Sequence, residues 1–272
     1  MCIRESNKNT FLGGMFTATN RSLTQEVLEL KRSAYSGGID LKHQWKNRAY
    51  YIDANMVVSR VNGSKESIQL TQENLTHLFN RVDASHLEVD PNRTSLTGTG
   101  GRFDFGKVGG QHWNYNAGFK WVSPELELND IGFLRKADEI TQFINLKYRI
   151  IKPVGVFRDL RFDISQFSKF DFEGNYNRLQ YDFNTDISFV NNWTIDFGLA
   201  YKPRNYLNTT LRGGPRWRIS KNGYQYLFVN SDKRKKFYFY FIYCAKINLA
   251  LKKIFEPTKR DPNSLSRFRM QK

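Results

Sequence analysis

Four aspartates in the second half of the chain have the side-chain type and spacing that could support chemistry. Carboxylates act as general acids and bases and as ligands for hard cations. Each lies on the polar side of a segment in which apolar and polar residues alternate, near basic residues such as Arg161, Arg178 and Lys202. The four are Asp163, Asp182, Asp186 and Asp196. Charges of both signs are also ordinary in a water-lined barrel interior, so we predict lumen contacts and no catalytic residue.

The cysteines and histidines do not indicate a cofactor or metal site. Cys2 and Cys244 lie at opposite ends of the chain, and the 4 histidines lack a ligand spacing such as HxxxH. We therefore predict no cofactor, no metal site and no disulfide framework.

Two loop segments carry further polar candidates. Residues 125–138 are acidic at one end, with Glu125 and Asp130, and basic near the other, at Arg135. This loop either plugs a lumen, contacts a ligand or is a packed structural loop. Arg212 precedes Gly213-Gly214-Pro215, whose backbone N–H groups could hold an anion. That segment lacks the Lys-Ser/Thr of a phosphate loop, which favours a tight bend.

The elements that position these residues are strands, most clearly in Asn175–Lys202. Leu179, Tyr181 and Phe183 alternate with polar residues, Asn191-Asn192 forms a turn, and the alternation then resumes. Side chains alternate across a strand, so this is a hairpin with one apolar and one polar face. Each arm has about the ~10 residues that a tilted strand needs to cross a bilayer.

The same pattern predicts about twelve antiparallel strands, the first over Thr10–Asn20, with a long loop and a short helix at 61–93 and a hairpin turn at Lys221-Asn222-Gly223. The predicted connections are short at 46–48, 106–110, 152–155, 191–192 and 221–223, and long at 21–33, 61–93, 123–136 and 203–214. Short turns at one end and long loops at the other are typical of outer-membrane barrels. We predict an all-β, antiparallel up-and-down transmembrane barrel over residues 1–243. The chain contains either all of the strands of this barrel or only part of them.

Bulk composition is compatible with this fold class. Mean hydropathy is −0.60 and the hydrophobic content is 40%. Both values fit a membrane barrel, because half of each strand in such a barrel faces water. Residues 233–272 carry +10 of the formal charge of +16, so the basicity is not spread over the fold as a nucleic-acid-binding patch would be. We predict no nucleic-acid partner. Residues 244–272 form a basic tail, either a non-native extension or a short amphipathic helix over Ala245–Phe255.

The N-terminus lacks a secretory hydrophobic region, which favours a fragment of a longer exported protein. Ser123–Asp138 (SPELELNDIGFLRKAD) is the most specific of several family-like segments; shorter ones are Gly14–Arg21, Gly37–Asp40, Phe79–Ala84 and Leu211–Pro215. These segments resemble the DUF5916 family of Bacteroidetes-type bacteria, whose members often carry a family 9 carbohydrate-binding domain. The resemblance covers residues 10–240.

The resemblance implies a C-terminal outer-membrane barrel that follows a signal peptide and a carbohydrate-binding module. We expect a pore or cell-surface scaffold of unknown substrate in the cell outer membrane, with membrane lipid as a partner and a glycan or other small solute as a candidate partner. The alternatives are a glycan-binding surface protein that uses aromatic residues such as Trp121 or Tyr206, and a polymer-processing hydrolase that acts through the missing N-terminal module. Tryptophans near strand ends fit either sugar stacking or a membrane-interface girdle.

Overall fold

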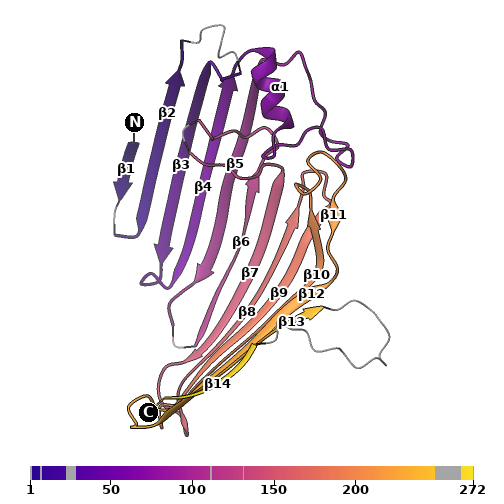
Figure 1. The fold of residues 1–272 in the computed structure, drawn as a ribbon. Coiled ribbons are helices and arrows are strands. Elements are labelled where there is room, and N and C mark those ends of the chain that lie inside the picture. Colours follow the sequence, from indigo (N-terminus) through magenta and orange to yellow (C-terminus); the bar gives the residue numbers. More distant parts are fainter. Residues whose placement is uncertain are drawn as a thin grey trace.

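A computed structural model describes residues 2–6, 8–22, 29–110, 112–130, 132–248 and 265–271. In these residues the chain forms one antiparallel sheet, and each main strand pairs with the next in chain order (Figure 1). The strands are β1 (Cys2–Ser6), β2 (Thr10–Asn20), β3 (Ser33–Trp45), β4 (Tyr50–Asn62), β5 (Ser95–Lys107), β6 (Trp113–Val122), β7 (Glu139–Ile150), β8 (Phe157–Phe170), β9 (Tyr176–Phe189), β10 (Thr194–Leu207), β12 (Asn222–Asn230), β13 (Tyr238–Asn248) and β14 (Leu265–Gln271). The short β11 (Trp217–Arg218) pairs with the end of β10, and the one helix described is α1 (Lys65–Glu73).

Strand boundaries agree with the prediction where the alternation is regular. Strand β2 spans Thr10–Asn20 as predicted, and α1 lies inside the long loop, where a short helix was predicted. Strand β10 runs past Pro203 to Leu207, although a loop was predicted from Pro203. The register with β9 shifts between Tyr201 and Arg204, and at such a bulge a proline does not have to donate a ladder hydrogen bond.

Two predictions near the C-terminus are wrong. Asn222-Gly223 is no hairpin turn: both residues begin β12 and pair with the Tyr201–Lys202 end of β10. The helix that was one of two alternatives for the tail does not begin at Ala245: Ala245–Asn248 is strand, because the pairing of β13 with β12 extends from Tyr240 to Asn248. The rest of that predicted helix lies outside the described residues. Strands β1 and β14 were not predicted, and with them the described residues form 14 strands against the predicted number of about twelve.

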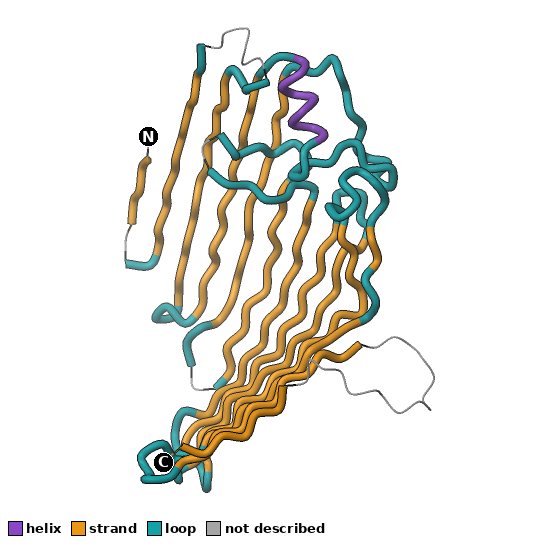
Figure 2. Tube along the Cα trace, in the orientation of Figure 1, coloured by secondary structure: helices purple, strands orange, loops and turns teal. Residues whose placement is uncertain are grey.

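Long and short connections lie at opposite ends of the sheet, as predicted. The loops at 63–94, 123–138 and 208–221 are at one end together with α1, at the top of Figure 2, and the turns at 46–49, 151–156 and 190–193 are at the other end. The connection at 231–237 is also at the turn end, and the short β8–β9 connection at 171–175 is an exception at the loop end.

The long loops pack against one face of the sheet. An added Cβ at Gly98 would collide with the backbone of Glu125 and Leu126, so only glycine lets the loop 123–138 lie on β5. We call the face toward which Gly98 points the loop-covered face, and the opposite face the apolar face. Two small cores lie between the loops and the loop-covered face. One contains Ala34, Val61, Ile68, Phe79 and Leu96, and the other Val122, Leu126 and Ala137.

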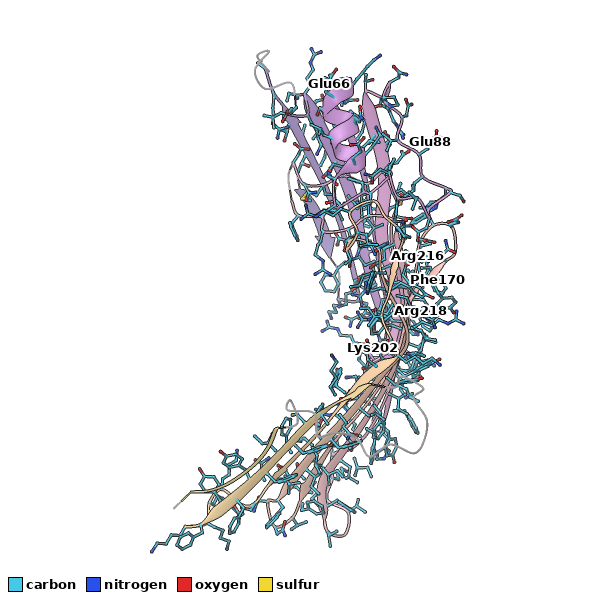
Figure 3. All side chains as sticks on the ribbon, turned by 45° about the vertical axis from the view of Figure 1, so that its right-hand side comes forward. Glu66, Glu88, Phe170, Lys202, Arg216 and Arg218 are labelled. Carbon is cyan, nitrogen blue, oxygen red and sulfur yellow. The ribbon has the colours of Figure 1, made fainter. Side chains whose placement is uncertain are left out.

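The sheet is open in the described residues. Strands β1 and β14, at its two edges, each pair with a single neighbour, so the predicted barrel closure is not seen. The sheet is nevertheless strongly curved, and it bends near the level of Lys202 (Figure 3).

Candidate functional site on the loop-covered face and at the loop junction

The predicted strand aspartates lie together on the loop-covered face. Asp163 Oδ1 is 3.2 Å from Lys147 Nζ, and Asp186 Oδ2 is 3.2 Å from Arg161 Nη1. Asp196 lies directly opposite Asp186 in the pairing of β9 with β10. These carboxylates therefore face nearby charges across adjacent strands, where side chains interact directly.

A ladder of polar contacts continues along β9 toward the loop end. Arg178 Nη2 donates to Gln180 Oε1 at 2.6 Å, and Gln180 Nε2 donates to both oxygens of Asp182 at 2.7 and 2.9 Å. The Arg178 guanidinium also lies over the Phe167 ring, 5.1 Å from its centroid. These contacts hold the side chains against the wall of the sheet.

The loop 123–138 is pinned to its neighbours by the acidic residues that the sequence singled out. Glu125 Oε1 is 2.6 Å from Arg93 Nη2, and Asp130 contacts both Arg21 at 2.8 Å and Lys31 at 3.2 Å. Arg135 is exposed. Because Leu126 and Ala137 are buried in the same loop, this segment is a packed structural loop that lies on the loop-covered face.

Glu127, which was not singled out from sequence, is the most deeply buried acid of this loop. Its Oε2 lies 3.1 Å from His77 Nε2 and 3.3 Å from Lys31 Nζ, and its Oε1 accepts from the Asn129 N–H at 2.6 Å. Burial alone would raise the pKa of Glu127, but the hydrogen bonds from His77 and Asn129 and the charge of Lys31 outweigh it and lower the pKa to about 2. Glu127 is therefore an ionised link between three loops.

Arg212 lies in a tight bend. Its backbone has a positive φ of 46°, its N–H donates to the Thr209 carbonyl at 3.3 Å, and its side chain is exposed. The Gly213 carbonyl accepts from the Val82 N–H at 3.2 Å. The bend thus joins the 208–221 loop to the 63–94 loop, in agreement with the interpretation as a bend.

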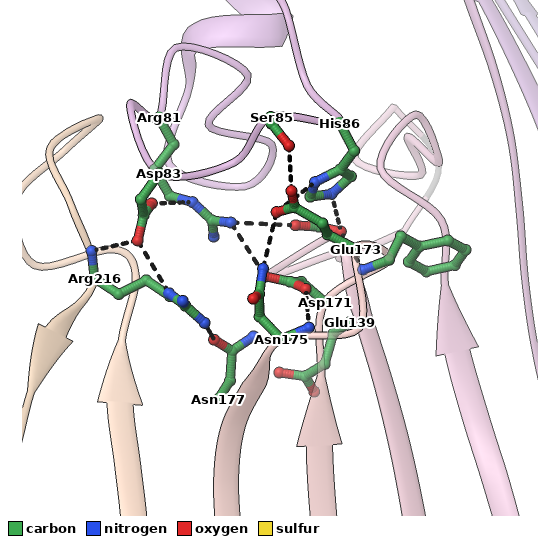
Figure 4. A network of polar contacts seen from close by, with 12 residues as sticks. Arg81, Asp83, Ser85, His86, Glu139, Asp171, Glu173, Asn175, Asn177 and Arg216 are labelled. Atoms are coloured by element: carbon green, nitrogen blue, oxygen red, sulfur yellow. Dashed lines mark hydrogen bonds and ion pairs between the residues drawn. The ribbon is translucent and has the colours of Figure 1, made fainter.

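Arg81 is the centre of a buried polar junction that joins four loops (Figure 4). Its guanidinium lies 3.0 Å from Asp83, 3.4 Å from Asp171 and 3.7 Å from Asp138. Arg216, from the 208–221 loop, donates to Asp83 at 3.0 Å from Nε and at 2.9 Å from its backbone N–H. Arg81, Asp138 and Asp171 are all buried, so each charge there depends on its partners.

His86 extends this junction toward the strand ends. Its Nε2 lies 2.9 Å from Asp138 Oδ1 and its Nδ1 3.5 Å from Glu173 Oε2. The Ser85 hydroxyl donates to Glu173, and this hydrogen bond lowers the pKa of that carboxyl, with a further contribution from Asn175. Glu173, Asn175 and Asp171 come from the β8–β9 connection, so this junction ties it to the long loop.

The junction was missed in the sequence because its partners are far apart in the chain. Arg216 and Asp83 are separated by 133 positions, and Arg81 and Asp171 by 90. A signal was nevertheless present: the segments that carry the family resemblance, Phe79–Ala84 and Ser123–Asp138, supply Arg81, Asp83 and Asp138. They meet in space at the loop end.

This arrangement positions the loops. Among the described residues, no group of three or more His, Cys, Asp or Glu side chains could hold a metal ion. In the same residues, no helix is long and apolar enough to cross a membrane. The charges described above form ion pairs and hydrogen bonds with one another, which fixes the loops against one another and against the sheet.

The aromatic candidates divide by position. Trp121 lies on the apolar face beside Phe119, with 5.8 Å between ring centroids, whereas Tyr206 stacks under Arg216 at 5.3 Å. Both are therefore already in contact with protein groups.

Comparison with known proteins places the sequence in one family. None of the curated proteins matches the chain. The family model described as a domain of unknown function, DUF5916, matches residues 16–266, somewhat more than the 10–240 of the predicted resemblance. This match covers nearly the whole chain, which therefore belongs to the DUF5916 family.

Proposed function

We propose that this chain forms the wall of an outer-membrane β-barrel that serves as a pore or cell-surface scaffold. The observation that carries the proposal is the large apolar surface of one sheet face. Exposed apolar side chains on that face extend from β2 to β10: Leu12, Phe16, Ile39, Met56, Val58, Phe105, Phe119, Ile144, Ile164, Tyr181 and Leu199. A soluble monomer rarely exposes a contiguous apolar patch of this extent.

Strand lengths and side-chain distribution support the same function. The main strands from β2 to β13 have 9 to 14 residues, enough to cross a bilayer at the usual tilt. The loop-covered face carries Arg161, Asp163, Asp182 and Asp186, as a water-lined interior would. Trp113 and Tyr148 lie in contact at the turn end of the apolar face, 4.7 Å apart, where an interface girdle would be.

The proposal requires the two edges of the sheet to meet, directly or through additional strands. Each unpaired backbone group costs several kcal/mol in hydrocarbon, so an open edge is not tolerated there. The loop 123–138, packed on the loop-covered face, would then narrow the lumen. The same face would contact solutes, while the apolar face would contact lipid.

Membrane extraction tests this proposal. The chain, exported behind a signal peptide, should sediment with outer membranes, resist a urea wash and enter solution only with detergent. Purified protein in planar bilayers should then distinguish a pore from a scaffold by the presence or absence of conductance. A protein that stays monomeric in buffer without detergent contradicts the membrane assignment.

A further inference from the structure

The loop-covered face changes character between β10 and β13. On β7 to β10 it carries the charged pairs described above. On β12 the three central residues that point to this face are aromatic: Tyr224, Tyr226 and Phe228 pair with Ala200, Gly198 and Asp196. A row of aromatic rings in an otherwise polar interior departs from the usual pattern of barrels, so it calls for a specific explanation.

Tyr226 is held flat along the wall. Its ring passes directly over Gly198 on β10, where an added Cβ would collide with ring atoms. Its hydroxyl donates to Asn184 Oδ1 on β9 at 3.1 Å, so the side chain reaches across one entire strand. Cross-strand cover of a glycine by an aromatic ring also stabilises sheets, and this accounts for Tyr226 alone.

The neighbouring rings are not explained by that role. Phe228 stacks on Tyr226 with centroids 5.1 Å apart, and Tyr224 lies under the ammonium of Lys202 at 5.6 Å while remaining 45% exposed. Together with Cys244 and Lys246 of β13, the three rings line a hollow of about 270 Å³. The hollow thus has an aromatic floor with ammonium groups beside it.

We propose that this hollow is a stacking platform for a saccharide chain on the loop-covered face. Sugar rings present C–H groups on their faces and hydroxyls around their edges, so a flat aromatic floor with donors and acceptors beside it matches them. Lys202 and Lys246 supply donors, and Asp196 on the adjacent strand β10, directly opposite Phe228, supplies acceptors. The mixed signs of these charges favour a hydroxyl-rich ligand over an ion of either sign.

This inference rests on the proposed function for the position of the platform inside a lumen, but its binding chemistry can be tested separately. Calorimetric titration of the full chain in detergent micelles with maltohexaose and with cellohexaose should show saturable binding of at least one of them. Tyr224→Leu keeps apolar bulk but removes the flat ring, and should weaken that binding about tenfold. Tyr226→Phe keeps its ring and should leave binding within about threefold of the original chain.

A matched control is Tyr181→Leu. Tyr181 has nearly the same exposure, 47%, but lies on the apolar face. This change should leave saccharide affinity unaltered. Absence of binding of both hexaoses, or equal effects of Tyr224→Leu and Tyr181→Leu, overturns the platform. Binding that persists in micelles while bilayers show no insertion leaves the platform intact and rejects the membrane barrel instead.

Discussion

The two faces of the sheet differ in what lies against them. The loop-covered face has ion pairs along its strands and packed loops at one end, and those loops are fixed by buried charges around Arg81 and Glu127. The apolar face instead exposes large side chains from strand to strand, with Ile164 53% and Phe16 53% exposed. A single alternating sequence pattern thus produces one surface suited to water and one suited to an apolar solvent.

The largest expected effect follows from removing the charge at the centre of the loop junction. Arg81→Ala leaves the buried carboxylates of Asp138 and Asp171 without their cation, and removal of one partner of a buried pair costs about 3–5 kcal/mol. Urea unfolding in detergent micelles should record this loss. Arg135→Ala, at an exposed arginine on the same side, should change stability by less than about 0.5 kcal/mol. Equal effects of the two changes would remove the junction as the element that fixes the loops.

The second prediction places the same charge on the two faces in turn. Ile164→Arg puts a guanidinium on the apolar face and should cost about 2–4 kcal/mol in a membrane-inserted barrel. Ser165→Arg, one residue along β8, points to the loop-covered face opposite Asp182 and should be tolerated. Refolding yield into lipid vesicles measures both. If both arginines are tolerated equally, the two faces do not have different solvents.

Acid should release the packed loops from the loop-covered face. The folded-state pKa of Glu127 is about 2 against an ordinary 4.5, so its contribution is complete above pH 4.5 and is lost as the pH falls toward 2. The shift corresponds to about 3 kcal/mol. Limited proteolysis at the loops should increase across this window. Glu127→Gln should show weakened protection already at neutral pH and little further change with acid; an unaltered acid profile in that variant would exclude Glu127.

The smallest expected effect concerns α1, the helix within the 63–94 loop. Ser64 caps α1 by accepting from the Ser67 N–H at 3.1 Å, and Ser64→Ala should cost about 1 kcal/mol. Ser64→Asp retains an acceptor and should remain close to the original chain in thermal unfolding. A loss of similar size in both variants would indicate that the hydroxyl has another role.

Much of the strand order could be predicted from local alternation, because side-chain direction in a strand depends only on position. Thr10–Asn20 is an example with agreement at both ends. Local pattern failed where pairing with a distant strand decides the outcome. Asn222-Gly223 has a hairpin sequence, yet it starts β12 because β10 offers nine consecutive partners across the intervening loop. Pairing with β12 likewise overrode the helical spacing after Cys244.

The residues of the candidate site likewise fall into those that the local sequence pattern could predict and those that it could not. Asp163, Asp182, Asp186 and Asp196 could be assigned to one face from the period of two, since that requires no knowledge of the fold. The Arg81 junction could not, because its members come from four separate connections that only the folded sheet brings together. His77 and Glu127 were missed for the same reason, with 50 positions between them.

Quenching of tryptophan fluorescence by brominated lipid tests the central claim most directly. Trp45, Trp113 and Trp121 belong to the apolar face, so a variant with Trp193→Phe and Trp217→Phe reports on that face alone. In vesicles of lipids brominated on their acyl chains, the fluorescence of this variant should fall strongly, while iodide in the water should have little effect. Fluorescence that iodide quenches and brominated lipid leaves unaltered would contradict a lipid-facing apolar surface.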